Sequence, residues 1–305
     1  MPPPTLLAVP NVSEGRDPAA IDAIGHAFAG SAPDGSPRAS LLDVHSDADH
    51  HRSVFTLAGS PGSLSQALLA GARAVTDIVD LSTRDPEDPD QAGKHPHVGA
   101  LDVVPIVYLD PADRGAACAE ALVTAELIGD ELAIPAFLYG ELTEGRTRAE
   151  LRHGGLRALA ERIATRELQP DFGPAAPHRT AGATLVAARP PLVAFNLQLA
   201  PPAALADARR IAAAIREGGA NGILGLRAIG IELAGPIAQV SMNVEDPFNT
   251  PLAQIVDAVR AHAPVASAEL VGLVPRAALE NFPDDLPMPG FDPARHVIEN
   301  RLGSS

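Results

Sequence analysis

Short apolar runs alternate along the chain with segments whose apolar residues recur at helical spacing. In the first half, such runs predict strands at 6–10, 40–44, 53–59 and 101–109. Asp17 followed by Pro18 is a typical helix start, and Ile21, Ile24 and Phe28 continue it with helical period. A second helix is predicted by the spacing of Leu64, Leu68, Val75 and Val79. The predicted order is therefore strand, helix, strand, strand, helix, strand.

The second half of the chain repeats this order. Apolar runs predict strands at 192–199, 224–233, 237–244 and 267–274. Alanine-rich and amphipathic segments predict helices at 203–217 and 252–262. The turn-forming residues Ala234-Gly235-Pro236 indicate a hairpin between the second and third of these strands.

The repeated order predicts an α+β fold of two ferredoxin-like βαββαβ subdomains. Between the halves we expect a helix-strand unit at 113–139 and a polar helical stretch at 148–167. Segment 170–182 is rich in Pro, Gly and Ala, which indicates a boundary. We therefore expect an N-terminal subdomain at 1–180 and a C-terminal subdomain at 181–305. A cleft between two such halves is the usual place for a ligand.

Composition narrows the class of protein. Of the 305 residues, 46% are hydrophobic, which is enough for a substantial core. No run approaches 18 apolar residues, and the N-terminus has no basic segment before a long apolar run. We therefore expect neither a transmembrane helix nor a signal peptide. The single cysteine, Cys118, excludes a disulfide framework and a cysteine-based zinc site. Because a chain without disulfides suits a reducing compartment, we expect a cytoplasmic protein.

The formal net charge of −15 argues against binding to nucleic acid or to anionic membranes. The cations are 22 Arg and a single Lys, Lys94. An acidic protein can still bind an anion where arginines gather in one cleft. The alternative is that the preference for Arg reflects composition alone.

Residues 94–103 read KHPHVGALDV and form the first candidate site. Histidine titrates near neutral pH, so His95 and His97 are candidate proton carriers in a loop before a buried strand. Asp102 is a candidate to orient an imidazole or to receive a positive charge. The alternative interpretation is an ordinary surface loop.

Residues 43–52 read DVHSDADHHR and form the second candidate site. Three histidines and three aspartates within nine residues are typical of a segment that provides metal ligands. The alternative is a solvated polar turn between two strands.

Two further segments carry turn-forming residues. Residues 11–15, NVSEG, follow the first strand and offer backbone N–H groups and an amide to a ligand. Residues 170–183 contain PDFGP and TAGA and form either a ligand-binding loop or a plain linker.

Taken together, these motifs resemble the formiminotransferase domain of the glutamate formimidoyltransferase family, which in animals is fused to a cyclodeaminase. The resemblance is carried, in collinear order, by VPNVSEG (9–15), HRSVFTLAG (51–59), HPHVGALDVVP (95–105), IPAFLYGE (134–141), PDFGP (170–174), GATLVAAR (182–189), LVAFNLQL (192–199), AQVSMN (238–243) and ELVGLVP (269–275). No cyclodeaminase segment follows, so the resemblance is to a stand-alone transferase.

The resemblance implies transfer of the formimino group from N-formimino-L-glutamate to tetrahydrofolate, a step of histidine degradation. It implies a homodimer whose subdomains face each other across the ligand cleft, with tetrahydrofolate as co-substrate and no metal. His95 is implied as the catalytic acid/base. Folate is expected in the second half of the chain, against 173–182 and 225–230, at Gly173, Pro174, Gly182, Gly225, Arg227 and Gly230.

The substrate-binding candidates are Asn11, Ser13, Glu14, His45, Arg52, His97 and Asp102. Arg52 is the candidate for a donor carboxylate, because a guanidinium pairs with it through two hydrogen bonds. The chain departs from the family at His97, where an arginine is usual, and at His45 and His51, where the animal enzyme has aspartate and asparagine. These departures leave open a related folate-dependent one-carbon transferase with another donor or acceptor. A metal-dependent hydrolase using His45, His50, His51 and His95, and a non-catalytic folate-binding homologue, are the further alternatives.

Overall fold

A computed structural model describes residues 3–31, 35, 37–85, 88, 96–233 and 235–303. The chain divides into two compact units, Met1–Arg189 and Pro190–Ser305. Each unit has its own sheet and its own hydrophobic core. No helix in the described part of the chain is long and apolar enough to cross a bilayer.

The first unit is built on a seven-stranded sheet. Its strands are β1 (Leu6–Ala8), β2 (Asn11–Val12), β3 (Ser40–Asp47), β4 (Arg52–Gly59), β5 (Leu101–Val107), β6 (Ala136–Leu138) and β7 (Thr184–Arg189). β1 and β2 both pair with β4 on one side and β5 on the other, so they act as one interrupted strand. Across the sheet the order is β3, β4, β1 with β2, β5, β7 and β6. β5, β6 and β7 are parallel, whereas the other pairs are antiparallel.

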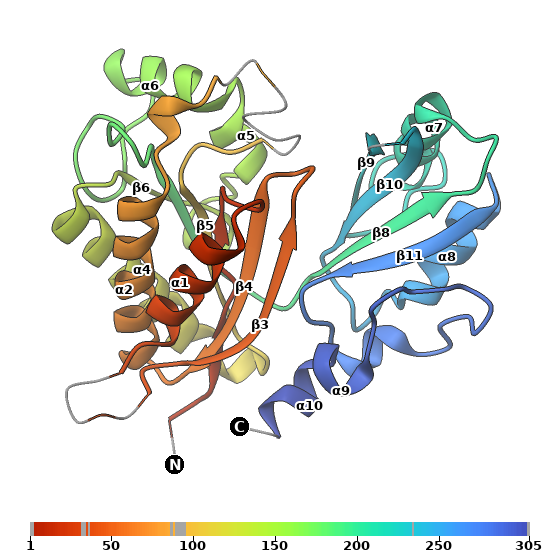
Figure 1. Ribbon diagram of the computed structural model, residues 1–305, viewed down its shortest axis with the longest axis horizontal. Helices are drawn as coiled ribbons and strands as arrows, with labels where there is room; N and C mark the ends of the chain where they lie inside the picture. The colour runs from red at the N-terminus through yellow and green to blue at the C-terminus, as the bar shows by residue number, and fades with distance from the viewer. Residues whose placement is uncertain are drawn as a thin grey trace. The chain divides into compact units, whose positions relative to one another are not determined.

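Helices cover both faces of this sheet. They are α1 (Pro18–Ala29), α2 (Ser63–Ile78), α4 (Arg114–Leu132), α5 (Arg148–Arg152) and α6 (Gly155–Ala164), with short 3-10 turns at Leu81–Thr83, Pro111–Asp113 and Gly140–Leu142. The main core joins one face to α1, α2 and α4, which lie together in Figure 1. A second core packs residues of α5 and α6 against the opposite face, at β5, β6 and β7.

Local sequence explains the starts of these helices. Asp17 accepts hydrogen bonds from the N–H groups of Ala19 and Ala20, and Pro18 occupies the first turn, as predicted. α2 has no side-chain cap of its own. Instead, the buried carboxylate of Glu120 on α4 accepts from the N–H groups of Gly62 and Ser65, at 2.7 and 2.6 Å. This contact ties α4 to the first turn of α2.

The second unit is a four-stranded antiparallel sheet. Its strands are β8 (Val193–Leu199), β9 (Leu226–Leu233), β10 (Ile237–Val244) and β11 (Val265–Val271), in the order β11, β8, β10, β9. α7 (Leu205–Ile215) and α8 (Leu252–Arg260) pack on its apolar face. A 3-10 turn at Arg276–Leu279 and the short helices α9 (Pro293–His296) and α10 (Ile298–Leu302) follow. The predicted hairpin joins β9 to β10, with Leu233 opposite Ile237.

The predicted α+β class and the repeated βαββαβ order are confirmed. In each unit the fourth strand of the repeat lies beside the first, and the third lies between the first and the second. The division between units follows Arg189, after the expected boundary at 180/181. The difference is β7, which pairs with β5 and β6 and so belongs to the first sheet.

Candidate active site

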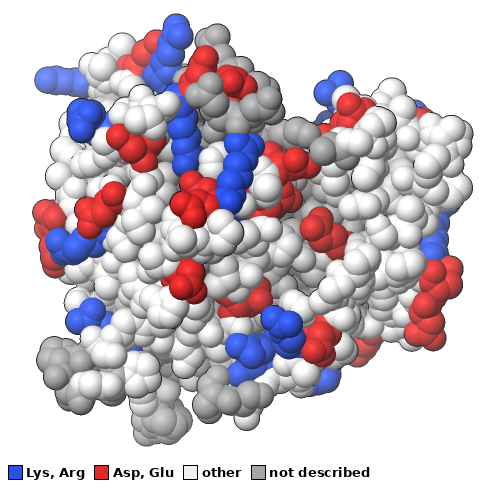
Figure 2. All heavy atoms as spheres, viewed as in Figure 1, with Lys and Arg blue, Asp and Glu red and all other residues white. Residues whose placement is uncertain are grey.

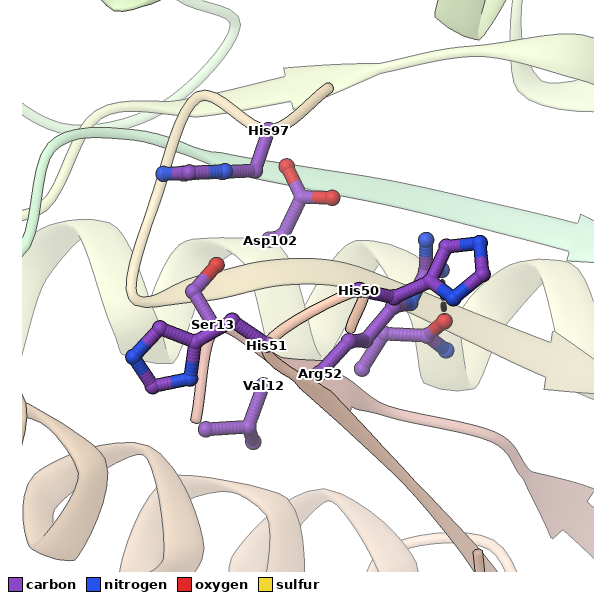
Figure 3. A pocket seen from close by; sticks show the side chains of 8 residues that line it. Val12, Ser13, His50, His51, Arg52, His97 and Asp102 are labelled. Atoms are coloured by element: carbon purple, nitrogen blue, oxygen red, sulfur yellow. Dashed lines mark hydrogen bonds between the residues drawn. The ribbon is translucent and has the colours of Figure 1, made fainter. Parts of the chain in front are cut away.

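A polar depression lies in the first unit, where β2 ends, β4 begins and β5 begins. Its enclosed volume is ≈ 10 Å³, about the space of one water molecule. The lining residues are Asn11, Val12, Ser13, His50, His51, Arg52, His97 and Asp102 (Figure 3). Five predicted substrate-binding residues are therefore brought together here: Asn11, Ser13, Arg52, His97 and Asp102.

A β-bulge places Asp102 in this depression. Asn11 of β2 lies opposite Val103, and Val12 lies opposite Leu101, so Asp102 is the additional residue of β5. As a result Leu101 packs in the core beneath α1, α2 and α4, whereas Val103 packs on the opposite face. Without the bulge, two residues spaced by two would share one face of the sheet. The bulge therefore frees Asp102 from the regular strand pairing.

Asp102 is held from two sides. Its Oδ1 accepts a hydrogen bond of 2.9 Å from the N–H of Val98, and its Oδ2 accepts one from Nη2 of Arg152. The Asp102 side chain is 3% exposed and that of Arg152 is 11% exposed, so this is a buried ion pair. Asp102 thereby fixes the loop that carries His97. Arg152 is not among the predicted site residues, because it lies in a polar helical stretch without a distinctive motif.

Arg52 and Asn11 form the second contact of the site. Nη2 of Arg52 donates to Oδ1 of Asn11, and Nδ2 of Asn11 donates to the carbonyl of Val9 at 2.7 Å. The Asn11 amide is thus oriented with its oxygen toward the Arg52 guanidinium. Burial, and then the positive charge of Arg152, lower the pKa of Arg52 to about 9, while Asp102 acts in the opposite direction. Arg52 therefore remains a cation at neutral pH.

Glu14 lies beside the depression and orders its edge. Its Oε2 accepts a hydrogen bond of 3.0 Å from Nη2 of Arg84, and its Oε1 accepts from the N–H groups of Arg16 and Asp17. The Arg84 guanidinium also donates to the carbonyl of Ser13 at 2.6 Å. Arg84 was not among the predicted site residues. It ties residues 13–14 to the segment after α2.

His51 is a neutral, structural histidine. Its Nδ1 accepts a hydrogen bond of 3.1 Å from the N–H of Gly15, so Nδ1 carries no proton. Burial, and then the positive charge of Arg84, lower the pKa of His51 to about 4. The 3.4 Å approach of Nδ1 to Oε1 of Glu14 is therefore no ion pair at neutral pH. His51 is unsuited to carry a proton near neutrality.

Ser13 holds the turn between the strand ends. Its Oγ donates to the carbonyl of Gly99 at 2.7 Å, and its N–H donates to the carbonyl of Ala100 at 2.8 Å. The predicted Ser13 thus lines the site while its hydroxyl fixes the start of β5.

The other histidines of the second motif point to different partners. His50 contacts Asp47, with Nδ1 2.9 Å from Oδ2 and its N–H donating to Oδ1 at 2.8 Å. Burial opposes ionisation of Asp47, but the hydrogen bonds from His50 outweigh it and lower the pKa of Asp47 to about 2. His45 lies on β3 opposite Val54 and does not line the depression. Among the described residues, no group of three or more His, Cys, Asp or Glu side chains is arranged to hold a metal.

The residues expected to bind folate fall in both units. Gly173, Pro174 and Gly182 belong to the first unit. Gly225, Arg227 and Gly230 belong to the second unit.

Two of these glycines also have packing roles. A Cβ at Gly182 would lie 2.4 Å from the Val98 carbonyl oxygen, and one at Gly230 would lie 2.2 Å from the Arg209 nitrogen on α7. Arg227 contacts Glu217 and Glu245 through its guanidinium, at 3.3 and 3.2 Å.

His95 and Lys94, the centre of the first motif, lie outside the described residues. The predicted roles of these two residues therefore rest on the sequence alone.

A larger groove of ≈ 500 Å³ lies elsewhere on the first unit, between α1 and β3. Its lining is mostly apolar, with Ile21, Leu41 and Val44 among its residues. His26, on its edge, hydrogen bonds within α1 to the carbonyl of Asp22. The groove therefore lacks the clustered polar chemistry of the depression.

Charged side chains are interspersed on the face shown in Figure 2, where the described residues form no broad basic area. Of the arginines at this site, Arg52 lines the depression, and Arg152 contacts Asp102, which also lines it.

Comparison with known proteins matches both units. Residues 5–189 match the family model of the formiminotransferase domain, N-terminal subdomain, and residues 194–283 match that of the formiminotransferase domain. The first match ends at the last residue of the first unit.

Individual relatives agree along most of the chain. The chain is 34% identical to a glutamate formimidoyltransferase of Streptococcus pyogenes serotype M1, over 96% of this chain and 97% of the relative. It is 31% identical to a glutamate formimidoyltransferase of Thermoplasma acidophilum, over 96% of each chain. A formimidoyltransferase-cyclodeaminase of Sus scrofa is 37% identical over 89% of this chain and 50% of its own length.

Proposed function

Because the chain belongs to the formiminotransferase family, we propose that it transfers a formimino group from N-formimino-L-glutamate to tetrahydrofolate. The products are 5-formiminotetrahydrofolate and glutamate. The observation that carries the proposal is the meeting of Asn11, Arg52 and Asp102 in one depression. These residues come from three separate motifs that the chain has in common with the family, and they converge on a small polar site.

The transfer needs two proton movements. Tetrahydrofolate supplies the nucleophile, its N-5 nitrogen, which attacks the formimino carbon. The nitrogen of the departing glutamate must be protonated, because an amide-like anion is a poor leaving group. One histidine with a pKa near neutrality can accept the first proton and donate the second.

His95 is the proposed acid/base, because the stretch HPHVGALDVVP (95–105) resembles the family around its catalytic histidine. Two histidines in the described part of the chain are less suited to this role, because their ring nitrogens are already engaged. Nδ1 of His51 is occupied by the Gly15 N–H, and His50 is engaged with Asp47. His97 lines the depression and is proposed to face the donor.

The remaining site residues bind and orient. Arg52 is proposed to pair with a donor carboxylate, held in place by its hydrogen bond to Asn11. Ser13 and Glu14 order the turn after β2. Asp102 fixes the loop 96–98 through Val98 and Arg152. Of the predicted set, His45 has the weakest support, because it lies off the depression.

The folate contacts are proposed at Gly173, Pro174, Gly182, Gly225, Arg227 and Gly230, as the family resemblance implies. A homodimer, a cytoplasmic location, a place in histidine degradation and the absence of a metal from the reaction are further parts of the proposal.

The test is a direct transfer assay. Purified protein is incubated with tetrahydrofolate and N-formimino-L-glutamate, and the folate absorption spectrum is followed. The expected result is a spectral change that requires both substrates. The matched control replaces N-formimino-L-glutamate with glutamate, which has the same carboxylates and no group to transfer. Absence of turnover with either tetrahydrofolate or its polyglutamylated form contradicts the proposal.

A further inference from the structure

A second group of polar side chains borders the depression on the side of α5. Thr147 and Glu150 form a reciprocal capping box that fixes the first turn of this helix. Arg148 and Arg152 are four residues apart on α5, so they lie on the same face. Arg152 reaches Asp102, and the Arg148 guanidinium lies 5.8 Å from the centre of the Tyr139 ring. This face of α5 therefore joins Tyr139 to the depression.

Two donors in this group lack a partner among the described residues. The hydroxyl of Tyr139 is buried without a hydrogen bond, and so is Nε of Arg152. Tyr139 is only 6% exposed. A buried donor left unpaired is costly, and buried tyrosine hydroxyls usually have a partner. A ligand that supplies acceptor oxygens would satisfy both.

The charge of the group indicates the kind of ligand. Arg52 interacts electrostatically with Arg152, Asp102, Arg148 and Tyr139. Three guanidiniums thus stand beside one carboxylate, in a chain whose formal net charge is −15. Guanidinium and hydroxyl donors together are the groups that bind a carboxylate.

We propose that Arg148, Arg152 and Tyr139 form a second carboxylate subsite beside Arg52, which makes the enzyme selective for a donor with two carboxylates. This rests on the proposed function, in which Arg52 binds the other carboxylate. N-formimino-L-glutamate carries two carboxylates, so one donor molecule occupies both subsites. A monocarboxylate fills one subsite and leaves the buried donors of the other unpaired.

The subsite is tested by ligand binding without folate. Glutarate, a dicarboxylate, and butyrate, a monocarboxylate of similar length, are titrated calorimetrically into the full chain. The wild type is expected to bind glutarate more tightly than butyrate. Tyr139→Phe keeps the ring and removes only the hydroxyl, and Arg148→Gln removes one cation. Each is expected to weaken glutarate binding about tenfold, as for a lost hydrogen bond to a charged group, with butyrate binding unchanged.

Arg157→Gln on α6 is the matched control, because Arg157 is 82% exposed and contacts Glu161 only at 3.7 Å. It is expected to bind glutarate as the wild type does. The proposal is overturned if the wild type does not prefer glutarate to butyrate, or if Tyr139→Phe binds glutarate normally. If the wild type transfers no formimino group but the variants still lose glutarate binding, the subsite stands. In that case only the proposed function is refuted.

Discussion

Arg152 donates a hydrogen bond from Nη2 to Oδ2 of Asp102, although the two residues are 50 positions apart in the sequence. The contact joins α5 to the bulge at the start of β5, and Oδ1 of the same carboxylate accepts from the N–H of Val98. One side chain thus links a helix, a strand and the loop that carries His97. The position of that loop depends on this buried pair.

Asp102→Ala is expected to destabilise the first unit. The substitution leaves the Arg152 guanidinium buried without its carboxylate and the Val98 N–H without its acceptor. Removal of one partner of a buried ion pair typically lowers the free energy of unfolding by roughly 3–5 kcal/mol. Urea unfolding followed by circular dichroism measures the change. Arg157→Ala, which affects an exposed pair, serves as control and is expected to unfold as the wild type does.

His95→Ala is expected to retain the fold and to lose most turnover, because the leaving nitrogen then lacks its proton donor. The expected loss in kcat is roughly 10²–10⁴-fold. Binding of tetrahydrofolate, followed by fluorescence, is expected to persist. A variant that turns over within about threefold of the wild type falls far short of that range and assigns the acid/base role elsewhere.

His51 makes stability depend on pH. Its pKa is lowered from 6.5 in the unfolded chain to about 4 in the folded protein. Between these pH values the unfolded chain binds the proton more readily than the folded protein. The stability that neutral His51 contributes is therefore present above about pH 6.5 and is lost as the pH falls toward 4. His51→Asn removes this group. At His51 φ is 48°, a left-handed conformation that asparagine tolerates better than most residues.

When the pH is lowered from 7 to 5, the unfolding free energy of the wild type is expected to fall more than that of His51→Asn. The expected difference between the two decreases is on the order of 1–2 kcal/mol. Chemical denaturation at the two pH values gives both slopes. His26→Asn is the control, since His26 is exposed on α1. Equal pH dependence in the wild type and His51→Asn contradicts the assigned role.

Most of the fold could be predicted from the sequence because apolar periodicity and turn residues agree along both halves. β7 was not predicted. Its run follows a segment rich in Pro, Gly and Ala, which was interpreted as a boundary, and its pairing with β5 and β6 is set by distant strands. Local pattern carries no information about such pairings.

The candidate site could be predicted in part, because some of its residues lie in recognisable motifs. Asn11, Arg52 and Asp102 lie in short motifs next to strand ends, where side chains of neighbouring strands meet. Arg152 and Arg84 lie in segments without such motifs, and only the packing of α5 and of the turn after α2 brings them to the site. The bulge at Asp102 likewise depends on strand pairing, not on local sequence.

His97→Arg is expected to strengthen donor binding. His97 lines the depression with Arg52 and Asp102. The family resemblance implies an arginine at this position. A neutral imidazole cannot form the paired hydrogen bonds that a guanidinium forms with a carboxylate. The wild type is therefore expected to bind N-formimino-L-glutamate weakly near neutral pH. The arginine variant is expected to bind it about tenfold more tightly, as for an added charged hydrogen bond.

Calorimetric titration of N-formimino-L-glutamate into the wild type and the variant measures this effect, and titration of tetrahydrofolate is the control. Folate affinity is expected to be the same in both proteins, because the change alters the donor site alone. If the wild type already binds the donor tightly and His97→Arg has no effect, position 97 does not contact the donor. In that case the loop 96–98, held by Asp102, would support the catalytic histidine without contributing to donor selection.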